Sequence, residues 1–211
     1  MNTAGCRIIV FAKAPVSGRV KTRLIPSLGP SGAASLYRQL VFRALSIAID
    51  AKIGPVDLWC TPSAGHPFFR RCVRKFSISL FDQTAGDLGA RMAHAFRETL
   101  RLASTVVLIG TDCPSLTSDD LRAAASVLRR GVDAVIGPAE DGGYVLIGLR
   151  RYTPELFTGI SWGTGSVLRE TEERLFGLGW ESFRLSEHWD VDRPEDVERL
   201  KREGFGRPLK K

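Results

Sequence analysis

Four cationic side chains follow the first apolar segment of the chain within eleven residues. Residues 8–11 are short and apolar, as buried strands are, and Lys13, Arg19, Lys21 and Arg23 come after them. In an open α/β sheet, ligands bind outside the carboxyl ends of the strands. Gly18 allows the backbone of this loop to approach a phosphate closely. The pattern predicts a site for a ligand with several negative charges, which we interpret as a diphosphate-bearing nucleotide; residues 13–24 are called the basic loop below.

An aspartate follows a second apolar run in the same way. Residues 105–110 are continuously apolar, which is typical of a strand buried on both faces, and Asp112 comes just beyond them. Mg²⁺ and Mn²⁺ are commonly held by one or two carboxylates together with substrate phosphates. The alternative role for Asp112 is to cap the following helix, but Thr117 and Asp120 fit a capping box there better. We therefore interpret Asp112 as a metal ligand.

Three polar residues alternate with apolar ones near the end of the chain. In an extended segment, His188, Asp190 and Asp192 would project to the same face. Such a row would complete the metal site that Asp112 opens. The alternative divides the row, with Asp192 capping the last helix and His188 at the surface. We expect at least one of the two aspartates to reach the metal.

Two carboxylates and two glycines lie between the apolar runs 132–137 and 144–149. A carboxylate beside a sugar or hydroxyl acceptor can act as its general base, and glycines let the backbone approach a ligand closely. The same residues are typical of a polar hairpin turn, and the two interpretations are compatible. The candidate catalytic residues are Glu140 and Asp141, and the candidate ligand-binding glycines are Gly142 and Gly143.

Two further stretches carry weaker signals. Asp87 opens a helix after a strand, where it contacts the nucleotide or simply caps the helix, and Arg91 faces either a phosphate or water. Trp162 is placed to stack on a base or a sugar ring, although a single aromatic residue more often serves packing. Neither stretch identifies a ligand by itself.

Bulk composition excludes several classes of protein. The 211 residues are 44% apolar, enough for one domain spanning residues 1–211. The net charge is +7, but outside the basic loop the cations are scattered and lack interleaved aromatic residues, so we expect no nucleic-acid partner. No secretory signal and no run of about 18–20 apolar residues is present, which predicts a cytoplasmic protein. The four cysteines form no C-x-x-C pair and are expected to be reduced.

Apolar runs alternate with amphipathic stretches almost from end to end. This pattern predicts a three-layer α/β/α, Rossmann-like domain with a mostly parallel mixed sheet, in which residues 132–149 form an antiparallel hairpin. Strands are expected at residues 7–11, 55–61, 76–81, 105–110, 132–137, 144–149 and around 181–185, and helices at 31–50, 87–102, 117 to about 130, 165–176 and from 194 onward.

Five motifs along the chain resemble those of the DUF2064 family. They are FAKAPVSGRVKTRL (11–24), QTAGDLGARM (83–92), IGTDCPSL (109–116), GPAEDGGYVLIGL (137–149) and DVDRPEDV (190–197). The family is also called rSAM/selenodomain-associated transferase 1 and is linked by gene context to arsenosugar-biosynthesis glycosyltransferases. The resemblance implies a nucleotide-diphospho-sugar transferase fold of the GT-A type and a divalent metal.

The resemblance extends to small nucleotidyltransferases, including the 2-phospholactate guanylyltransferases and molybdenum-cofactor enzymes. Two departures separate the chain from both groups. Glycosyltransferases of this fold usually carry D-x-D on the metal strand, where only Asp112 stands here. Nucleotidyltransferases usually carry a glycine-richer first loop, where only Gly18 is available.

The motifs together favour a metal-dependent glycosyltransferase that moves a sugar from a nucleotide-diphosphate sugar to a small acceptor. In this interpretation the four cations of the basic loop neutralise the diphosphate, and Asp112 with Asp190 or Asp192 holds Mg²⁺ or Mn²⁺. Glu140 or Asp141 faces the acceptor. The alternatives are a nucleotidyltransferase that releases pyrophosphate from a nucleoside triphosphate, and a nucleotide-binding protein without catalysis. The oligomeric state does not follow from the sequence.

Overall fold

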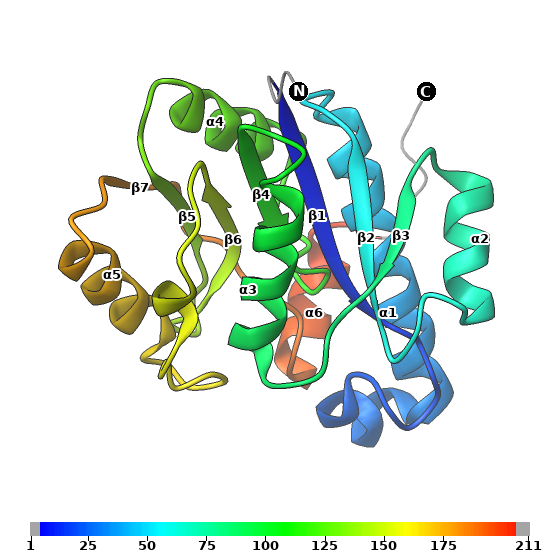
Figure 1. Cartoon of the computed structure of the whole chain (residues 1–211). Helices are drawn as coiled ribbons and strands as arrows, with labels where there is room; N and C mark the ends of the chain where they lie inside the picture. The colour runs from blue at the N-terminus through cyan, green and yellow to red at the C-terminus, as the bar shows by residue number, and fades with distance from the viewer. Residues whose placement is uncertain (1–4, 206–211) are drawn as a thin grey trace.

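Seven strands form one mixed sheet in the computed structural model, which describes residues 5–205 (Figure 1). Their order across the sheet is β3-β2-β1-β4-β6-β5-β7, and only β6 runs antiparallel to its neighbours. The mostly parallel sheet and the 132–149 hairpin are thereby confirmed. The strands are β1 (Cys6–Lys13), β2 (Val56–Thr61), β3 (Ser79–Asp82), β4 (Thr105–Ile109), β5 (Ala134–Pro138), β6 (Tyr144–Leu149) and β7 (Ser182–Arg184).

Helices cover both faces of the sheet, as the three-layer prediction requires. Side chains alternate between the faces along each strand, so Ile8 and Val10 of β1 pack with α1, α2 and α4, whereas Ile9 and Phe11 pack with α3 and α5. Figure 1 shows α3 in front of the sheet and α1 behind it. The helices are α1 (Ile25–Asp50), α2 (Pro67–Lys75), α3 (Leu88–Thr99), α4 (Ser118–Arg129), α5 (Val167–Gly177) and α6 (Pro194–Arg202), with short 3₁₀ turns η1 (Thr22–Leu24) and η2 (Pro154–Phe157).

Helix α2 has no counterpart among the elements expected from the sequence. It is only nine residues long, and four of its nine side chains are charged and exposed. Its apolar contacts come from Phe68, Phe69 and Cys72, which are buried against the sheet, and the His66 side chain caps Phe68 N. Because α2 extends to Lys75, β3 begins later than the expected position 76.

Helix α1 begins earlier than the expected position 31. Its first residues, from Ile25, are joined to the main helix across a kink at Gly29, whose φ of 67° is unfavourable for residues with a Cβ. Pro30 then starts the regular part. None of the helices within residues 5–205 is long and apolar enough to cross a membrane.

The chain order places a crevice between β1 and β4. From β1 the chain adds β2 and β3 on one side, and then returns to β4 on the other side of β1. In open α/β sheets such a switch point is where ligands bind, at the carboxyl ends of the strands. Lys13 ends β1 and Asp112 follows β4, so the topology brings these two predicted site residues to the same edge.

A buried ion pair joins β1 to β2 away from this edge. Asp57 is 2% exposed and accepts hydrogen bonds from Arg7 Nε at 2.9 Å and from a second guanidinium nitrogen at 2.7 Å. Asp57→Ala is expected to lower the free energy of unfolding by about 3–5 kcal/mol, because it leaves a mostly buried guanidinium without its partner. Urea denaturation checks the value. Glu173→Ala, which breaks an exposed pair with Arg169, should cost less than about 1 kcal/mol, and equal losses would contradict the prediction.

Candidate active site

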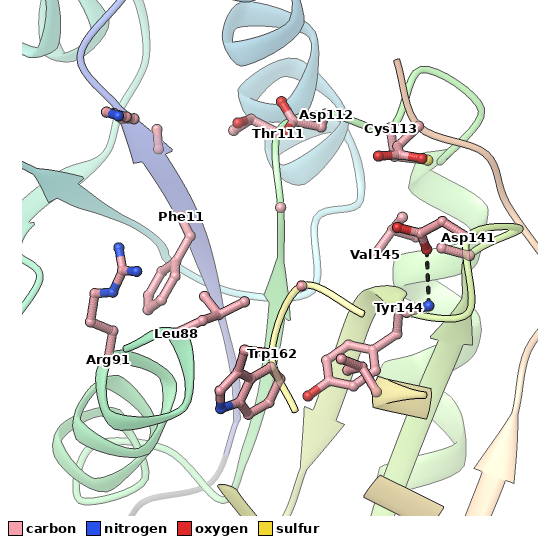
Figure 2. Close-up of a pocket in the computed structure, with 18 of the residues that line it drawn as sticks. Phe11, Leu88, Arg91, Thr111, Asp112, Cys113, Asp141, Tyr144, Val145 and Trp162 are labelled. Atoms are coloured by element: carbon pink, nitrogen blue, oxygen red, sulfur yellow. Dashed lines mark hydrogen bonds between the residues drawn. The ribbon is translucent and has the colours of Figure 1, made fainter. Parts of the chain in front are cut away.

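A pocket of about 410 Å³ opens at the carboxyl edge of the sheet (Figure 2). This volume is in the range of pockets that hold small molecules. Its lining follows the strand order: Gln83 after β3, Thr61 of β2, Lys13 of β1, Asp112 after β4 and Tyr144 of β6. With neighbouring strands about 4.8 Å apart, four steps across the sheet span roughly 19 Å. The pocket is therefore elongated and suits a ligand of several linked groups.

Tyr37 of α1 ties the ends of β1 and β4 together beneath the pocket. Its hydroxyl oxygen accepts a hydrogen bond from Lys13 N at 2.9 Å and lies 3.1 Å from Thr111 Oγ1. Burial and the neighbouring Asp112 carboxylate raise the pKa of Tyr37, so this hydroxyl stays neutral. The bonds fix the relative positions of the two strand ends that carry Lys13 and Asp112.

Lys21 is the basic-loop residue whose side chain turns inward onto Asp112. Its Nζ lies 3.0 Å from Asp112 Oδ2, and only 5% of its side chain is exposed. The backbone at Lys21 is left-handed, with φ of 46°, a conformation that non-glycine residues rarely adopt. Asp112 Oδ1 is shielded from solvent and has no hydrogen-bond partner in the described part of the chain. One oxygen of Asp112 is thus neutralised, and the other has a free lone pair.

Backbone hydrogen bonds place Asp190 between Asp112 and the β5–β6 turn. His188 N donates to Pro138 O, and Glu140 N donates to His188 O, both at 2.9 Å. On the other side, Val191 N donates to Asp112 O at 2.9 Å. The segment therefore bridges the ends of β4 and β5, and Asp190 lines the pocket.

Three carboxylates share this part of the pocket with a single buried ammonium. Burial, and then the negative charge of Asp141, raise the pKa of Asp190 to about 6; Lys21 opposes the shift, and Asp112 adds to it. Hard carboxylate oxygens in excess over cations fit Mg²⁺ or Mn²⁺. No ready-made cage of three ligands is present among residues 5–205, which is compatible with a metal that takes most of its ligands from substrate phosphates and water.

A family model matches residues 44–164, more than half of the chain; its description is an uncharacterized protein conserved in bacteria, DUF2064. The chain belongs to the DUF2064 family. A solved candidate nucleotide-diphospho-sugar transferase from Desulfovibrio desulfuricans G20 is 32% identical, with a TM-score of 0.85 over 96% of this chain and 89% of that one. No curated protein matches the sequence.

More distant solved structures share the fold of this DUF2064 chain. One is 4-diphosphocytidyl-2C-methyl-D-erythritol synthase from Anaerococcus prevotii DSM 20548, at 8% identity and a TM-score of 0.61 over 96% of each chain. Another is CMP:2-keto-3-deoxy-manno-octonic acid synthetase complexed with CTP, at 13% identity and a TM-score of 0.58 over 94% of this chain and 98% of that one. The comparisons confirm the nucleotide-diphospho-sugar transferase fold, and they support a transferase.

The structure divides the basic loop of the DUF2064 chain. Lys13 lines the pocket and Lys21 reaches it through Asp112, whereas Arg23 pairs with Asp192 outside the lining. Arg19 is exposed and also lies outside the lining. Gly18, with φ of 78°, makes the turn that the loop needs. Of the four predicted cations, Lys13 therefore lines the pocket itself, and Lys21 acts on it through its ion pair with the lining residue Asp112.

The two predicted catalytic carboxylates point to different places. Asp141 lines the pocket, and its Oδ1 accepts a hydrogen bond from Gly143 N at 2.9 Å, the contact drawn in Figure 2. Glu140 instead accepts two hydrogen bonds from Arg199 of α6, at 2.9 and 3.1 Å, and does not line the pocket. Gly142 has φ of 84°, and a Cβ there would lie 2.2 Å from Gly165 O. The segment therefore forms a turn, and the functional interpretation of Asp141 stays a prediction compatible with that turn.

The row formed by His188, Asp190 and Asp192 is split, because backbone bonds on both sides hold the segment instead of a regular strand. Asp190 faces the pocket, Asp192 pairs with Arg23, and the His188 ring lies 3.3 Å from Ser115 Oγ. The alternative that places His188 at the surface is also wrong, since it is 7% exposed.

Two helix-capping expectations have opposite outcomes. The prediction that Asp192 caps α6 is wrong: Arg193 is the N-cap residue, and the Asp196 carboxylate accepts hydrogen bonds from Asp192 N and Arg193 N just before the helix. Asp87 does cap α3, where its Oδ1 accepts from Ala90 N at 2.8 Å, and it does not line the pocket. The Thr117–Asp120 capping box of α4 is confirmed.

Three pocket residues carried only weak sequence signals. Arg91 and Trp162 line the pocket, as does Tyr144 at the start of β6 (Figure 2). Arg91 belongs to the 83–92 motif, and its Nε donates to Asp87 O at 3.1 Å, which orients the guanidinium.

Burial raises the pKa of the Cys113 thiol, so this pocket cysteine is protonated and unsuited to nucleophilic attack.

Asp190→Asn is expected to stabilise the metal-free DUF2064 chain increasingly as pH rises. The folded-state pKa of about 6 lies above the ordinary 3.8, so the wild type loses stability through Asp190 as pH rises across this interval. Asparagine carries no charge and removes that loss. Urea denaturation in EDTA at about pH 4.5 and about pH 7.5 should show a variant-minus-wild-type difference that grows with pH. A difference independent of pH would contradict the prediction.

Proposed function

We propose that this protein is a metal-dependent glycosyltransferase that moves a sugar from a nucleotide-diphosphate sugar to a small acceptor. The observation that carries the proposal is the uneven charge of the pocket. We call Lys13, Gln83 and Arg91 the basic half, and Asp141, Tyr144, Trp162 and Asp190 the acidic half. Figure 2 shows Arg91 and Phe11 across the pocket from Asp141 and Tyr144.

The basic half suits the nucleotide and its phosphates. Lys13 and Arg91 line it, and the buried Lys21 lies at its junction with Asp112. A nucleoside diphosphate gains negative charge as its bond to the sugar breaks, and cations held in place stabilise that charge without reorganising. The cations therefore favour departure of the diphosphate.

The acidic half suits a neutral sugar and a hydroxyl acceptor. Asp141 is held by Gly143 N, and its other oxygen is free to accept a proton from an attacking hydroxyl. Nucleotidyl transfer to an acceptor that presents a phosphate or carboxylate would bring a further anion beside Asp141, which is not one of the residues proposed to hold the metal. Repulsion between like charges in this partly buried site opposes such an acceptor. The charge pattern thus favours glycosyl over nucleotidyl transfer.

Asp112 and Asp190 are the residues that would hold the metal. The unpartnered Asp112 Oδ1 fits a divalent cation at this position. Burial raises the pKa of Asp190 most, and the negative charges of Asp141 and Asp112 add to the shift, so a cation beside these carboxylates would be favourable. When bound, Mg²⁺ or Mn²⁺ would supply positive charge for the diphosphate. Lys21, held against Asp112, adds a positive charge of the protein itself.

Product analysis tests the proposal. A thermal-shift panel of nucleotides with and without Mn²⁺ first identifies the nucleoside, because ligands that bind the folded state raise its melting temperature. The protein is then incubated with the matching nucleotide-diphosphate sugars and, separately, with the matching nucleoside triphosphate. Free or transferred sugar together with nucleoside diphosphate is the expected result. Pyrophosphate release would instead establish a nucleotidyltransferase, and metal-dependent binding without turnover would establish a nucleotide-binding protein.

A further inference from the structure

Two aromatic rings form one wall of the acidic half of the pocket. Tyr144 begins β6, and Trp162 lies in the loop between η2 and α5; their ring centroids are 6.4 Å apart at an interplanar angle of 85°. Figure 2 shows both rings on the same side of the pocket, with Asp141 beside Tyr144. Both residues line the pocket, so part of each aromatic surface is available to a ligand.

Gly89 of α3 provides the space in which Trp162 sits. A Cβ at position 89 would lie 2.5 Å from Trp162 Nε1 and 2.6 Å from Phe157 O, both too close for any side chain. The indole is thus held against the backbone of α3 and presents its remaining surface to the pocket. The position of this ring is set by the fold rather than by side-chain flexibility.

The chemistry of this wall matches an uncharged sugar ring. A sugar ring presents C–H groups that pack on aromatic surfaces, together with hydroxyl groups that donate hydrogen bonds to carboxylates. Trp162 and Tyr144 supply the aromatic surfaces, and Asp141 and Asp190 supply the carboxylates, from separate elements that face one space. Both kinds of contact are available to a single bound ring.

Asp141 disfavours a sugar that carries its own carboxylate. Among the pocket-lining residues that the structure describes from position 139 onward, none is a lysine or an arginine. The two cations that line the pocket, Lys13 and Arg91, belong to the basic half. A uronic acid in the acidic half would therefore meet the Asp141 carboxylate, to which neither a lining cation nor the proposed metal is assigned.

We infer that the acidic half selects nucleotide-diphosphate sugars with an uncharged sugar and rejects those with a uronic acid, with Trp162 and Asp141 as the specificity-determining residues. This inference rests on the proposed function, because it assigns the donor sugar of the same site. Trp162 supplies affinity for the ring, and Asp141 supplies the discrimination against negative charge.

Matched donor pairs test the inference. Thermal shifts with UDP, GDP, CDP and dTDP in Mn²⁺ identify the nucleoside, and calorimetry then compares a neutral sugar with its uronate, for example UDP-glucose with UDP-glucuronic acid or GDP-mannose with GDP-mannuronic acid. The neutral donor should bind at least about tenfold more tightly than the uronate. Asp141→Asn should narrow this gap, because it removes one negative charge and retains the size of the side chain.

Trp162→Ala should lower the affinity for the neutral donor until it approaches the affinity for the nucleoside diphosphate alone. The affinity for the nucleoside diphosphate itself should stay unchanged. Trp162→Phe, which keeps an aromatic surface, should recover part of the loss. Phe176→Ala is the matched control, because Phe176 is 89% exposed on α5 and does not line the pocket. Circular dichroism confirms that each variant is folded, and the Asp141→Asn result is independent of any folding defect at Trp162.

The outcomes separate this inference from the proposed function. Equal affinities for both donors, or a preference for the uronate, would overturn the inference and leave glycosyl transfer intact. A Trp162→Ala variant that loses nucleoside diphosphate binding equally would overturn the assignment of Trp162 to the sugar. If no nucleoside diphosphate binds, the proposed function and the inference both fail.

Discussion

Asp112→Asn is expected to lower the rate of sugar transfer by about 10²–10³-fold, the loss typical when one electrostatic contact to developing charge is removed. Asp112 combines a free, shielded Oδ1 with an ion pair from Oδ2 to Lys21, at the switch point between β1 and β4. The amide keeps the shape of the side chain, but it removes the charge that attracts a divalent cation and leaves the Lys21 ammonium without its anionic partner. Affinity for Mn²⁺ should fall along with the rate.

Asp192→Asn is the matched control for this experiment. Asp192 belongs to the same set of aspartates proposed from the sequence, but it pairs with Arg23 outside the pocket lining. Its amide variant should keep a rate within about twofold of wild type, as expected for an exposed ion pair that contributes little. Steady-state rates and calorimetric titration with Mn²⁺ measure both variants. If Asp192→Asn lost as much activity as Asp112→Asn, the assignment that leaves Asp192 out of the metal site would be wrong.

Lys21→Met is expected to change two affinities in opposite directions. Hydrogen bonds that involve charged groups contribute about 1.5–3 kcal/mol, so binding of the nucleoside diphosphate should weaken by about 10–100-fold. In the absence of nucleotide, affinity for Mn²⁺ should instead rise, because Lys21 Nζ no longer neutralises Asp112 Oδ2. General destabilisation of the site would lower both affinities, so the opposite signs identify the role of Lys21.

The control for Lys21→Met comes from the same loop. Arg19→Met removes a cation that is exposed and outside the pocket lining, so both affinities should stay close to wild type. Each of the two variants is titrated with the nucleoside diphosphate and, separately, with Mn²⁺ alone. A loss of diphosphate binding in Arg19→Met equal to that in Lys21→Met would mean that the whole loop acts through its net charge rather than through one buried ammonium.

Elements with a clear apolar period were predictable from the sequence. Residues 105–110 are continuously apolar because β4 is buried on both faces, and the 132–149 hairpin follows from two apolar runs around a glycine turn. Helix α2 was missed, because only Phe68, Phe69 and Cys72 of its nine residues anchor it, and its charges dominate the pattern. The apolar period of a sequence therefore predicts an element that buries a full face, but not a short helix that buries only three side chains.

The site was predictable only as a list of candidates. Of the four cations in the basic loop, Lys13 lines the pocket and Lys21 pairs with the lining residue Asp112. Of the 140–141 pair only Asp141 lines the pocket. The four cations of the basic loop carry the same charge, as do the two carboxylates of the 140–141 pair. The sequence therefore could not show which member of each set faces the pocket. Trp162 carried almost no signal, because the space that receives it is formed by Gly89, more than seventy residues earlier.

The sequence by itself determined the order of the strands and of the helices other than α2 along the chain. It also determined the sheet edge at which the site lies and the positions of Lys13 and Asp112, because these follow directly from where strands end. Only the tertiary structure decided which of the remaining charged residues converge. The left-handed backbone at Lys21 turns its side chain inward, and hydrogen bonds from His188 and Val191 to the ends of β5 and β4 direct Asp190 into the pocket while Asp192 remains outside. These choices depend on backbone contacts between distant segments, which residue types and spacing do not encode.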